Sequence, residues 1–294
     1  MTFKFIEKKN FWFFISGLVI IPGLIYMGIN FFQTKPALNY GIDFVGGNTF
    51  NLKLNESVNE KEAITSTIRK TLKKYNLESS NIQFSNNNEI YIKTLAVESN
   101  ITTEILNDLK QEIGAFEILE IDFIGPSIGS ALKKQSLIII ISITLILLLY
   151  ITFRFELNFG IASIAALIHD TFVIISLSAL FNIEINTAFI AALLTVLGYS
   201  LNDTIVIFDR IREHLEINPS EDLNFTINKA LNETLVRTFN TSITTLLVIV
   251  ALIIFGGNTI KEFCTILAIG ILSGTYSSLC IASPILAKFS KKDI

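Results

Sequence analysis

Charged residues and cysteines are scarce in this 294-residue chain. Asp, Glu, Lys and Arg together make up 17% of it, whereas a soluble domain carries about 25% charged residues. The formal net charge of -3 gives no indication of a nucleic-acid partner. The only two cysteines, Cys264 and Cys280, lie in one apolar segment, so we interpret them as buried thiols and expect no disulfide framework. The composition therefore excludes an ordinary soluble protein.

The sequence also lacks the motifs of common enzymes and metal sites. It has no Gly-x-x-x-x-Gly-Lys-Ser/Thr phosphate loop, no His-Glu-x-x-His or other metal-ligand spacing, and no Gly-x-Ser-x-Gly nucleophile elbow. We therefore expect no metal, no cofactor and no enzymatic activity. The energy source that remains for work at a membrane is an ion gradient, in which each proton is worth about 2.3 kcal/mol per 100 mV.

Long uncharged runs are what the sequence has instead. Five of them reach or approach the roughly 20 apolar residues needed to cross a bilayer core, and a further apolar run contains His169 and Asp170. A cleaved signal peptide is an alternative for the first run, but its 25 uncharged residues exceed the roughly 7–15 of a signal sequence. We predict six transmembrane helices, at residues 10–34, 135–153, 158–181, 187–208, 238–256 and 263–287.

Lysines and arginines in the short connections predict the sidedness of the chain. They gather before the first span, at Arg154, after the fourth span at Arg210 and Arg212, and after the last span, but are nearly absent from 182–186 and 256–262. Both termini are therefore expected in the cytoplasm. The expected order is a cytoplasmic N-terminus (1–9), the first span, an outer segment (35–134), five further spans within 135–288 and a cytoplasmic tail (289–294).

The outer segment 35–134 has the pattern of one small α+β domain, because alternating apolar residues predict strands and four-residue spacing predicts helices. The predicted elements are a strand at 49–54, a helix at 64–72, strands at 82–84 and 90–94 with a turn at Ser85–Asn88 between them, a helix at 101–113 and a strand at 119–123. This β-α-β-β-α-β order is that of the ferredoxin-like fold. The segment has no Cys and no His, so we expect a binding or lever module.

Asp203 is the first of three polar features within the spans. A charged side chain at the centre of a span costs about 2.5–3.5 kcal/mol, so it needs a reason. Asp203 lies in the inner half of the fourth span, with apolar residues beyond it before Asp209, and Ser200 and Asn202 are near enough in sequence to hydrogen-bond to it. A carboxyl group removed from water binds a proton more readily, which suits a proton relay. The alternative is an acid that packs between helices or reaches the inner headgroups.

Arg237 is the second feature, and it begins the fifth span at a depth that can match Asp203. Asn240, Thr241 and Thr244 share its helical face, so the four residues form a polar stripe on an otherwise apolar helix. Such a stripe can pair with Asp203 and hold water near it. The alternative is that Arg237 is an anchor of the positive-inside kind.

His169 and Asp170, near the middle of the third span, are the third feature. Because neighbouring residues on a helix point about 100° apart, we expect no direct pairing between them. His169 is a candidate proton carrier and Asp170 a candidate second relay. If the span is shifted inward, both line a wetted vestibule instead. Gly270 and Gly274, four residues apart in the last span, predict close helix packing rather than chemistry.

Four stretches of the sequence resemble a known family. They are Gly41–Gly47 before the first strand, Phe123–Gly129 before the second span, Ala166–Asp170 in the third, and Gly198–Glu213 together with Asn232–Thr238. On these stretches, and over nearly its whole length, the chain resembles the SecD/SecF family of membrane subunits of the bacterial Sec preprotein translocase, and the SecF branch in particular. The signature includes Asp43, Gly46, Gly47 and Gly198.

The resemblance implies an auxiliary subunit that, with SecD, uses the proton-motive force to promote protein export through SecYEG after the ATP-driven SecA step. It implies a multi-pass protein of the bacterial inner (plasma) membrane that contacts lipid and the translocating preprotein and associates with YajC and YidC. It assigns proton transport to Asp203 and Arg237 and expects a further aspartate from SecD. The six-span unit is similar to that of the RND exporters, so an RND-type proton-coupled small-molecule exporter is the alternative. Such exporters usually hold two six-span units and two large outer domains in one chain.

Overall fold

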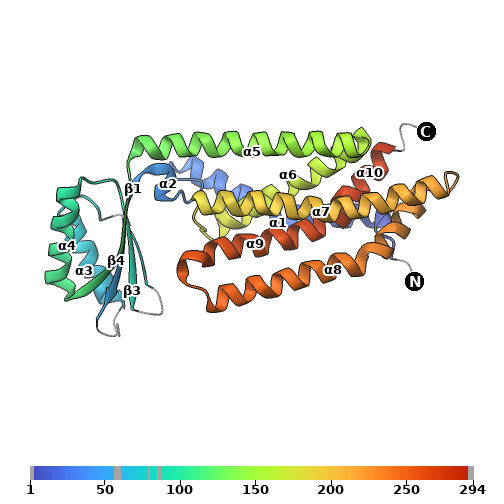
Figure 1. Ribbon diagram of the computed structural model, residues 1–294. Helices are drawn as coiled ribbons and strands as arrows, with labels where there is room; N and C mark the ends of the chain where they lie inside the picture. The colour runs from blue at the N-terminus through green and yellow to red at the C-terminus, as the bar shows by residue number, and fades with distance from the viewer. Residues whose placement is uncertain (1–2, 56–60, 79, 85–87, 291–294) are drawn as a thin grey trace. The chain divides into compact units, whose positions relative to one another are not determined.

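The computed structural model describes residues 3–55, 61–78, 80–84 and 88–290. Contacts divide the chain into two units, one formed by Met1–Asn39 and Ile138–Ile294 and the other by Tyr40–Leu137. Positions 1–2 and 291–294 of the two predicted cytoplasmic ends lie outside the described residues, as do positions 85–87 of the predicted turn. The first unit is helical, and the second holds a β-sheet (Figure 1).

Within the described residues, six helices are long and apolar enough to cross a membrane, which confirms the predicted number of spans. In chain order they are α1 (Lys9–Phe32, preceded by a 3-10 turn, Ile6–Lys8), α5 (Pro126–Arg154), α6 (Leu157–Leu180), α7 (Thr187–Ile217), α8 (Leu223–Phe255) and α9 (Asn258–Ser277). The last of these continues through a π-helical turn, η2 (Ser278–Ala282), into α10 (Ser283–Ser290).

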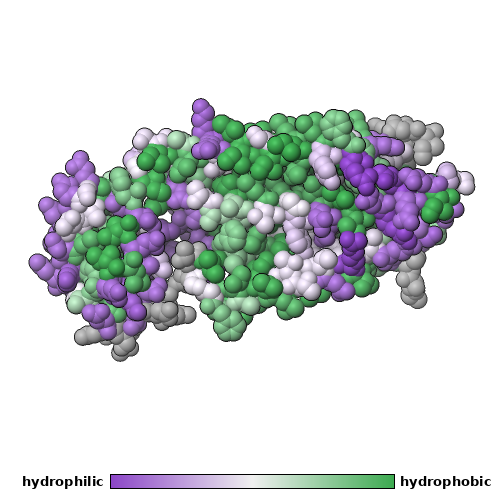
Figure 2. Space-filling view, in the orientation of Figure 1, coloured by the Kyte–Doolittle hydropathy of each residue, from purple (hydrophilic) through white to green (hydrophobic). Residues whose placement is uncertain are grey.

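Three of these helices form the inside of the helical unit and three its outside. In α6, α7 and the helix that runs from α9 into α10, half or more of the apolar stretch is buried within the chain, whereas in α1, α5 and α8 less than a fifth is. The side chains left on the outside are largely apolar, and Figure 2 shows this hydrophobic surface over the helical unit. Such a surface suits helices that face lipid or another membrane protein.

Small residues let α9 approach α7 closely. A Cβ atom at Gly274 would lie 2.8 Å from the Cβ atom of Ser200, and a Cβ atom at Gly270 would overlap Val196. The packing role predicted for Gly270 and Gly274 is therefore confirmed. The same device operates between α1 and α6, where a Cβ atom at Gly23 would lie 2.6 Å from the Cα atom of Ser176.

The helices α7 and α8 extend beyond the predicted spans into polar sequence, and only residues 218–222 separate them. The carboxylate of Asp222 accepts a hydrogen bond from the amide of Phe225 (3.1 Å) and caps α8. Buried side chains such as Ile211 and Ile227 hold the polar ends of the two helices in the core of the unit. Charged residues after the fourth predicted span therefore do not end the helix.

The second unit is an antiparallel sheet with helices on one face (Figure 1). Its elements are α2 (Ile42–Val45), β1 (Gly47–Leu54), α3 (Lys61–Lys73), β2 (Asn81–Phe84), β3 (Glu89–Thr94), α4 (Ser99–Ile113) and β4 (Phe116–Ile124). Among the described residues the sheet has four strands in the order β2-β3-β1-β4. This order and the β-α-β-β-α-β sequence of elements confirm the predicted ferredoxin-like arrangement.

The core of this α+β domain lies between the sheet and the helices α3 and α4. Each fully buried side chain of this size contributes about 1.5–3 kcal/mol through removal from water. The fully buried side chains are Phe50 and Leu52 of β1, Ile90 and Ile92 of β3, Ile68 and Leu72 of α3, and Ile105 and Leu109 of α4. The alternation seen in the sequence therefore marks the face of the sheet that the helices cover.

Candidate functional site

Asp203, the acid predicted as a proton relay, is buried near the middle of α7. Asp203 is 4% exposed, and no hydrogen-bond donor among the described residues reaches its Oδ2 atom. A carboxylate in this state has lost hydration without gaining hydrogen bonds in return, which is costly for a full charge. A carboxyl group without a fixed hydrogen-bond donor is able to change its charge state without breaking a network.

Arg237 of α8 interacts with Asp203 through electrostatics, but the two side chains form neither an ion pair nor a hydrogen bond in this conformation. The adjacent Thr238 is buried, and its hydroxyl has no partner among the described residues. Since α7 and α8 pack against each other, both helices of one interface carry a buried polar atom without a partner. Such atoms are rare in native proteins and each calls for an explanation.

The hydrogen bonds expected from Ser200 and Asn202 to Asp203 are not formed. The hydroxyl of Ser200 donates to Oδ2 of Asp170 at 2.6 Å, and Asn202 is exposed on the surface of α7. A hydroxyl has only one proton to donate, and the carboxylate across the α6–α7 interface takes it. The expectation considered only neighbours along the same helix, whereas the partner came from another one.

The polar stripe predicted on α8 lies on the outer surface of the helical unit, where Arg237, Asn240, Thr241 and Thr244 are exposed. The hydroxyls of Thr241 and Thr244 donate to the backbone carbonyls four residues earlier, at 3.1 and 2.9 Å. Among the described residues, the side chains of Arg237 and Asn240 form no ion pair and no hydrogen bond, and Arg237 interacts with Asp203 only through electrostatics. Because an unpaired charge on a lipid-facing helix is costly, the stripe suits a surface that a polar partner covers.

Asp170 of α6 is the second buried carboxylate, and its surroundings are the opposite of those of Asp203. It is fully buried and accepts hydrogen bonds from Ser200 of α7 (2.6 Å) and from Ser273 (2.6 Å) and Ser277 (2.8 Å) of α9. The four-residue spacing of the two α9 serines places both hydroxyls on the face that meets α6. Asp170 therefore joins the three inner helices at one point.

His169 contacts Asp170 directly, so the prediction that the two would not pair is wrong. Nδ1 of His169 lies 3.2 Å from Oδ1 of Asp170. The prediction considered only the directions in which the side chains leave the helix, and an imidazole ring reaches across the angle between neighbours. The other ring nitrogen, Nε2, lies 2.9 Å from Oγ of Ser16 on α1. Ser16 in turn lies 3.3 Å from Oη of Tyr276, which donates to the carbonyl of Trp12 at 2.5 Å.

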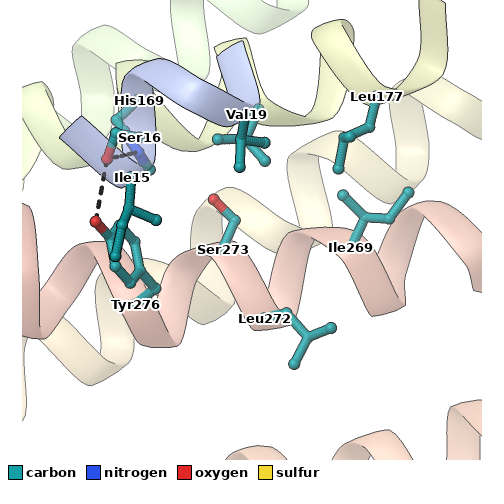
Figure 3. A pocket seen from close by; sticks show the side chains of 10 residues that line it. Ile15, Ser16, Val19, His169, Leu177, Ile269, Leu272, Ser273 and Tyr276 are labelled. Carbon is teal, nitrogen blue, oxygen red and sulfur yellow. Dashed lines mark hydrogen bonds between the residues drawn. The ribbon is translucent and has the colours of Figure 1, made fainter. Parts of the chain in front are cut away.

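A cavity of about 240 Å³ lies beside this chain of contacts, between α1, α6 and α9. Its polar lining comes from Ser16, His169, Ser273 and Tyr276, and the rest of its wall is apolar. Figure 3 shows Ser16 between the ring of His169 and the hydroxyl of Tyr276. The side chain of His169 is 9% exposed and that of Asp170 is 0% exposed. His169 is thus the member of the pair that the cavity can reach.

Charged residues at the ends of α7 and α8 form a separate cluster. Arg210 pairs with Glu213 (2.6 Å) and Glu233 (2.5 Å), and His214 lies 2.9 Å from the same Glu233 carboxylate. Glu233 and the arginine are about one-third exposed. Ion pairs of this exposure contribute roughly 0–1 kcal/mol each, so the cluster is a solvated helix end rather than a second site.

The glycines of the predicted signature serve the backbone of the α+β domain rather than chemistry. Gly46 has a φ of 78°, and a Cβ atom there would lie 2.8 Å from the Cα atom of Pro126. A Cβ atom at Gly47 would overlap the carbonyl of Thr94. Gly46 separates β1 from the short helix α2, which carries Asp43 in its first turn, and Gly47 is the first residue of β1. Nothing in the structure explains Gly198, around which there is open space.

No group of three or more His, Cys, Asp or Glu side chains in the described part of the chain could hold a metal ion. Cys264 and Cys280 are both buried and free. The ionisable side chains buried within the bundle among the described residues include those of Asp170 and Asp203.

Comparison with known proteins decides the family. The sequence profile described as "Protein export membrane protein SecD/SecF, C-terminal" matches residues 104–292, a region that contains Asp170, Asp203 and Arg237. The chain belongs to the SecD/SecF family of protein export membrane proteins. A protein translocase subunit SecF from Sebaldella termitidis is 38% identical over 99% of this chain and 94% of its own length. A SecF from Borreliella burgdorferi is also 38% identical, over 95% of this chain and 94% of its own.

Solved structures of SecDF share the fold. The crystal structure of SecDF from Thermus thermophilus, described as a translocon-associated membrane protein, matches 99% of this chain with a TM-score of 0.84 and 31% identity. A SecDF structure in a super-membrane-facing form matches the whole chain with a TM-score of 0.67 and 29% identity. This chain spans 39% of the length of each SecDF chain, so it corresponds to a part of those longer proteins. It is a multi-pass membrane protein of the SecD/SecF kind.

Proposed function

We propose that the chain is an auxiliary subunit of the Sec preprotein translocase that acts with a SecD partner and uses the proton-motive force to promote protein export through SecYEG. Its role follows the ATP-driven SecA step and involves no covalent chemistry. The proposal is supported by relatives that are named as translocase subunits. The observation that carries its mechanism is Asp203, a buried carboxyl group with an unpartnered oxygen in a membrane-spanning helix.

The proposed mechanism is a charge change at Asp203. The carboxyl group binds a proton from the outer side of the membrane and releases it on the inner side. The electrostatic interaction between Asp203 and Arg237 depends on the charge of the carboxyl group, because the guanidinium group of an arginine is a cation. The free energy of the gradient, about 2.3 kcal/mol per proton and 100 mV, then shifts α7 against α8. The movement is transmitted to the α+β domain outside the membrane.

The exposed stripe of α8 is the proposed contact with SecD. The side chains of Arg237 and Asn240 form no ion pair or hydrogen bond with any described residue, and they lie on a face that otherwise would meet lipid. A carboxylate supplied by SecD would neutralise the arginine in the membrane. The translocating preprotein, the SecYEG channel, YajC and YidC complete the proposed set of partners.

The proposed location is the bacterial inner membrane with both termini in the cytoplasm. Arg154, Arg210 and Arg212 support this orientation, since short connections on the cytoplasmic side of a membrane are rich in lysine and arginine. The α+β domain between α1 and α5 would then lie outside the cytoplasm, where preprotein emerges.

The direct test is Asp203→Asn in membrane vesicles that contain SecYEG, SecA, SecD and this chain. Proton flux and the increase in preprotein export caused by a proton gradient are expected to fall to background, while ATP-driven export without a gradient is unchanged. Glu216→Gln is the matched control, because Glu216 lies on the same helix with its side chain 71% exposed. Flux and export that Asp203→Asn leaves at the level of Glu216→Gln would remove Asp203 from the mechanism.

A further inference from the structure

The contacts around His169 determine where its protons are. They form a chain that ends on the backbone carbonyl of Trp12, and a carbonyl can only accept. The hydroxyl of Tyr276 donates to that carbonyl at 2.5 Å, so its oxygen is left to accept from Ser16 at 3.3 Å. Ser16 has a single proton and gives it to Tyr276. With the Ser16 proton directed to Tyr276, the contact of 2.9 Å between Ser16 and Nε2 of His169 is made by a proton on Nε2.

A proton on Nε2 fixes the charge state of the His169–Asp170 pair. If Nδ1 also carries a proton, His169 is an imidazolium beside a carboxylate. If Nδ1 carries none, its lone pair lies 3.2 Å from Oδ1 of Asp170, and the two acceptors tolerate this only when Asp170 is a carboxylic acid. Both arrangements contain the same number of protons and have no net charge. The geometry is thus that of a pair that has taken up one proton beyond neutral imidazole and carboxylate.

Loss of this proton would change the contacts of α1. With Nε2 bare, the hydroxyl of Ser16 would turn to donate to it, and Tyr276 would lose the hydrogen bond from Ser16. Of the hydrogen bonds between α1 and α9 named above, only that from Tyr276 to the carbonyl of Trp12 would then remain. A net negative charge would also remain at the junction of α6, α7 and α9, where the hydroxyls of Ser200, Ser273 and Ser277 already donate to Asp170.

Few other titratable groups surround the pair. Tyr276 of α9 touches it through Ser16, and its ring centroid lies 5.8 Å from that of His169. Cys280 lies one turn further along, in the π-helical turn, and Asp203 lies three residues beyond Ser200 on α7. The sequence of α1 has no charged residue after Lys9. Among the described residues, Asp170 forms no ion pair other than its contact with His169, so the proton of the pair is what neutralises it.

We propose that His169 and Asp170 form a second proton-binding site, one that clamps α1 against α6 and α9 through Ser16 and Tyr276 while it is protonated and loosens that clamp when the proton leaves. The cavity beside Ser16 and His169 gives the ring an exchange route that Asp170 itself lacks. The π-helical turn that directly follows Ser277 is the kind of helix irregularity often found at functional sites. The site does not depend on the role proposed for Asp203.

The test is nitrogen-15 NMR of the full-length chain in lipid bilayers as a function of pH. The chain has two histidines, so a His214→Gln background leaves the signal of His169 alone. We expect the Nε2 signal of His169 to change reversibly between that of a protonated and that of a bare ring nitrogen. A His169 that keeps one protonation state over the whole range in which the protein stays folded would overturn the proposal.

Two serine variants separate a proton site from a packing contact. Ser16→Ala removes the acceptor of the Nε2 proton, so the nitrogen-15 signal of Nε2 is expected to differ from that of the unaltered chain. Ser176→Ala is the matched control, because its hydroxyl also bonds α6 to α1, at the carbonyls of Val19 (2.9 Å) and Ile20 (3.0 Å), without touching the pair. Equal Nε2 signals in the two variants would contradict the proposal. This test measures the ring of His169, so its result does not depend on the result of export assays with Asp203 variants.

Discussion

Two buried carboxylates on neighbouring helices of the same bundle are held in opposite ways. Asp170 of α6 receives hydrogen bonds from three serine hydroxyls and contacts His169, whereas Asp203 of α7 has an oxygen that no described residue reaches. Ser200, one turn before Asp203 on the same helix, serves Asp170 instead. Burial is common to both acids, so burial alone does not distinguish their roles; the hydrogen-bond donors around them do.

The difference has an energetic consequence. Removing one member of a fully bonded buried network leaves several polar groups unpaired, and each of these has a desolvation cost of its own. Removing an acid that lacks donors leaves nothing unpaired that was paired before. The region around Asp170 should therefore behave as a structural junction, and the region around Asp203 as a place where charge can change at little structural cost.

The largest effect should come from truncating the bonded acid. Asp170→Ala leaves the hydroxyls of Ser200, Ser273 and Ser277 without their acceptor and is expected to lower the free energy of unfolding by about 3–5 kcal/mol. Asp203→Ala should change it by no more than about 1 kcal/mol. Equilibrium unfolding of the two variants in mixed micelles measures both. Equal losses of stability would remove the contrast between the two acids.

The close approach of α9 to α7 offers the next largest effect. Gly274→Ala places a methyl group 2.8 Å from the Cβ atom of Ser200, so it should displace that serine from Asp170 and cost about 1–3 kcal/mol. Gly198→Ala on α7 has open space and is expected to be neutral or to stabilise by up to about 1 kcal/mol. The measurement is the free energy of unfolding of the two variants under the same conditions. A Gly274→Ala variant as stable as Gly198→Ala would show that the α7–α9 contact does not position Ser200.

The charge near Asp203 should matter for transport more than for folding. Arg237→Gln is expected to reduce the gradient-dependent part of preprotein export about tenfold. The reason is that Asp203 would lose its electrostatic interaction with the positive charge of Arg237. Arg237→Lys keeps a positive charge and should retain more of the activity. Thermal unfolding of both variants should stay near that of the wild type, since Arg237 is exposed in this chain. Export that is the same for glutamine and lysine at this position would argue against a charge interaction.

A partly exposed carboxylate in the α+β domain, that of Asp108, gives the smallest effect and a reference for the buried ones. The ammonium of Lys74 lies 3.0 Å from Asp108 and holds the pKa of that carboxyl below its ordinary value of 3.8, with the pKa of Lys74 raised in turn. A depressed pKa means that the stabilisation is present above pH 3.8 and is lost as the pH falls below it. Amide exchange of α3 and α4 should therefore be slightly faster in Asp108→Asn than in the wild type at neutral pH, and the difference should vanish in acid. A difference that grows on acidification would contradict the assigned pairing.

Much of the fold could be predicted from the sequence, because long uncharged runs and two-residue alternation reflect burial in lipid and in a sheet. The six spans and the β-α-β-β-α-β order are of this kind. The ends of α7 and α8 could not be predicted, since charged residues mark the membrane surface and not the end of a helix.

The candidate site was predictable only in part. Asp203 and Arg237 stand out as charged residues in apolar sequence, but the partners of Asp170 do not. Ser16, Ser273 and Ser277 are ordinary polar residues of apolar helices, and only the four-residue spacing of the last two indicates that they share a face. Which helix that face meets is decided by packing between segments far apart in the sequence. The use of Ser200 by Asp170 rather than Asp203 is the clearest consequence.

The central claim is that Asp203 exchanges a proton within the membrane, and infrared difference spectroscopy of the full-length chain in lipid, titrated with pH, tests it most directly. We predict a carboxylic-acid carbonyl band that appears and disappears reversibly and that is absent from Asp203→Asn but retained in Glu216→Gln. A titration in which Asp203→Asn removes no such band would contradict the account.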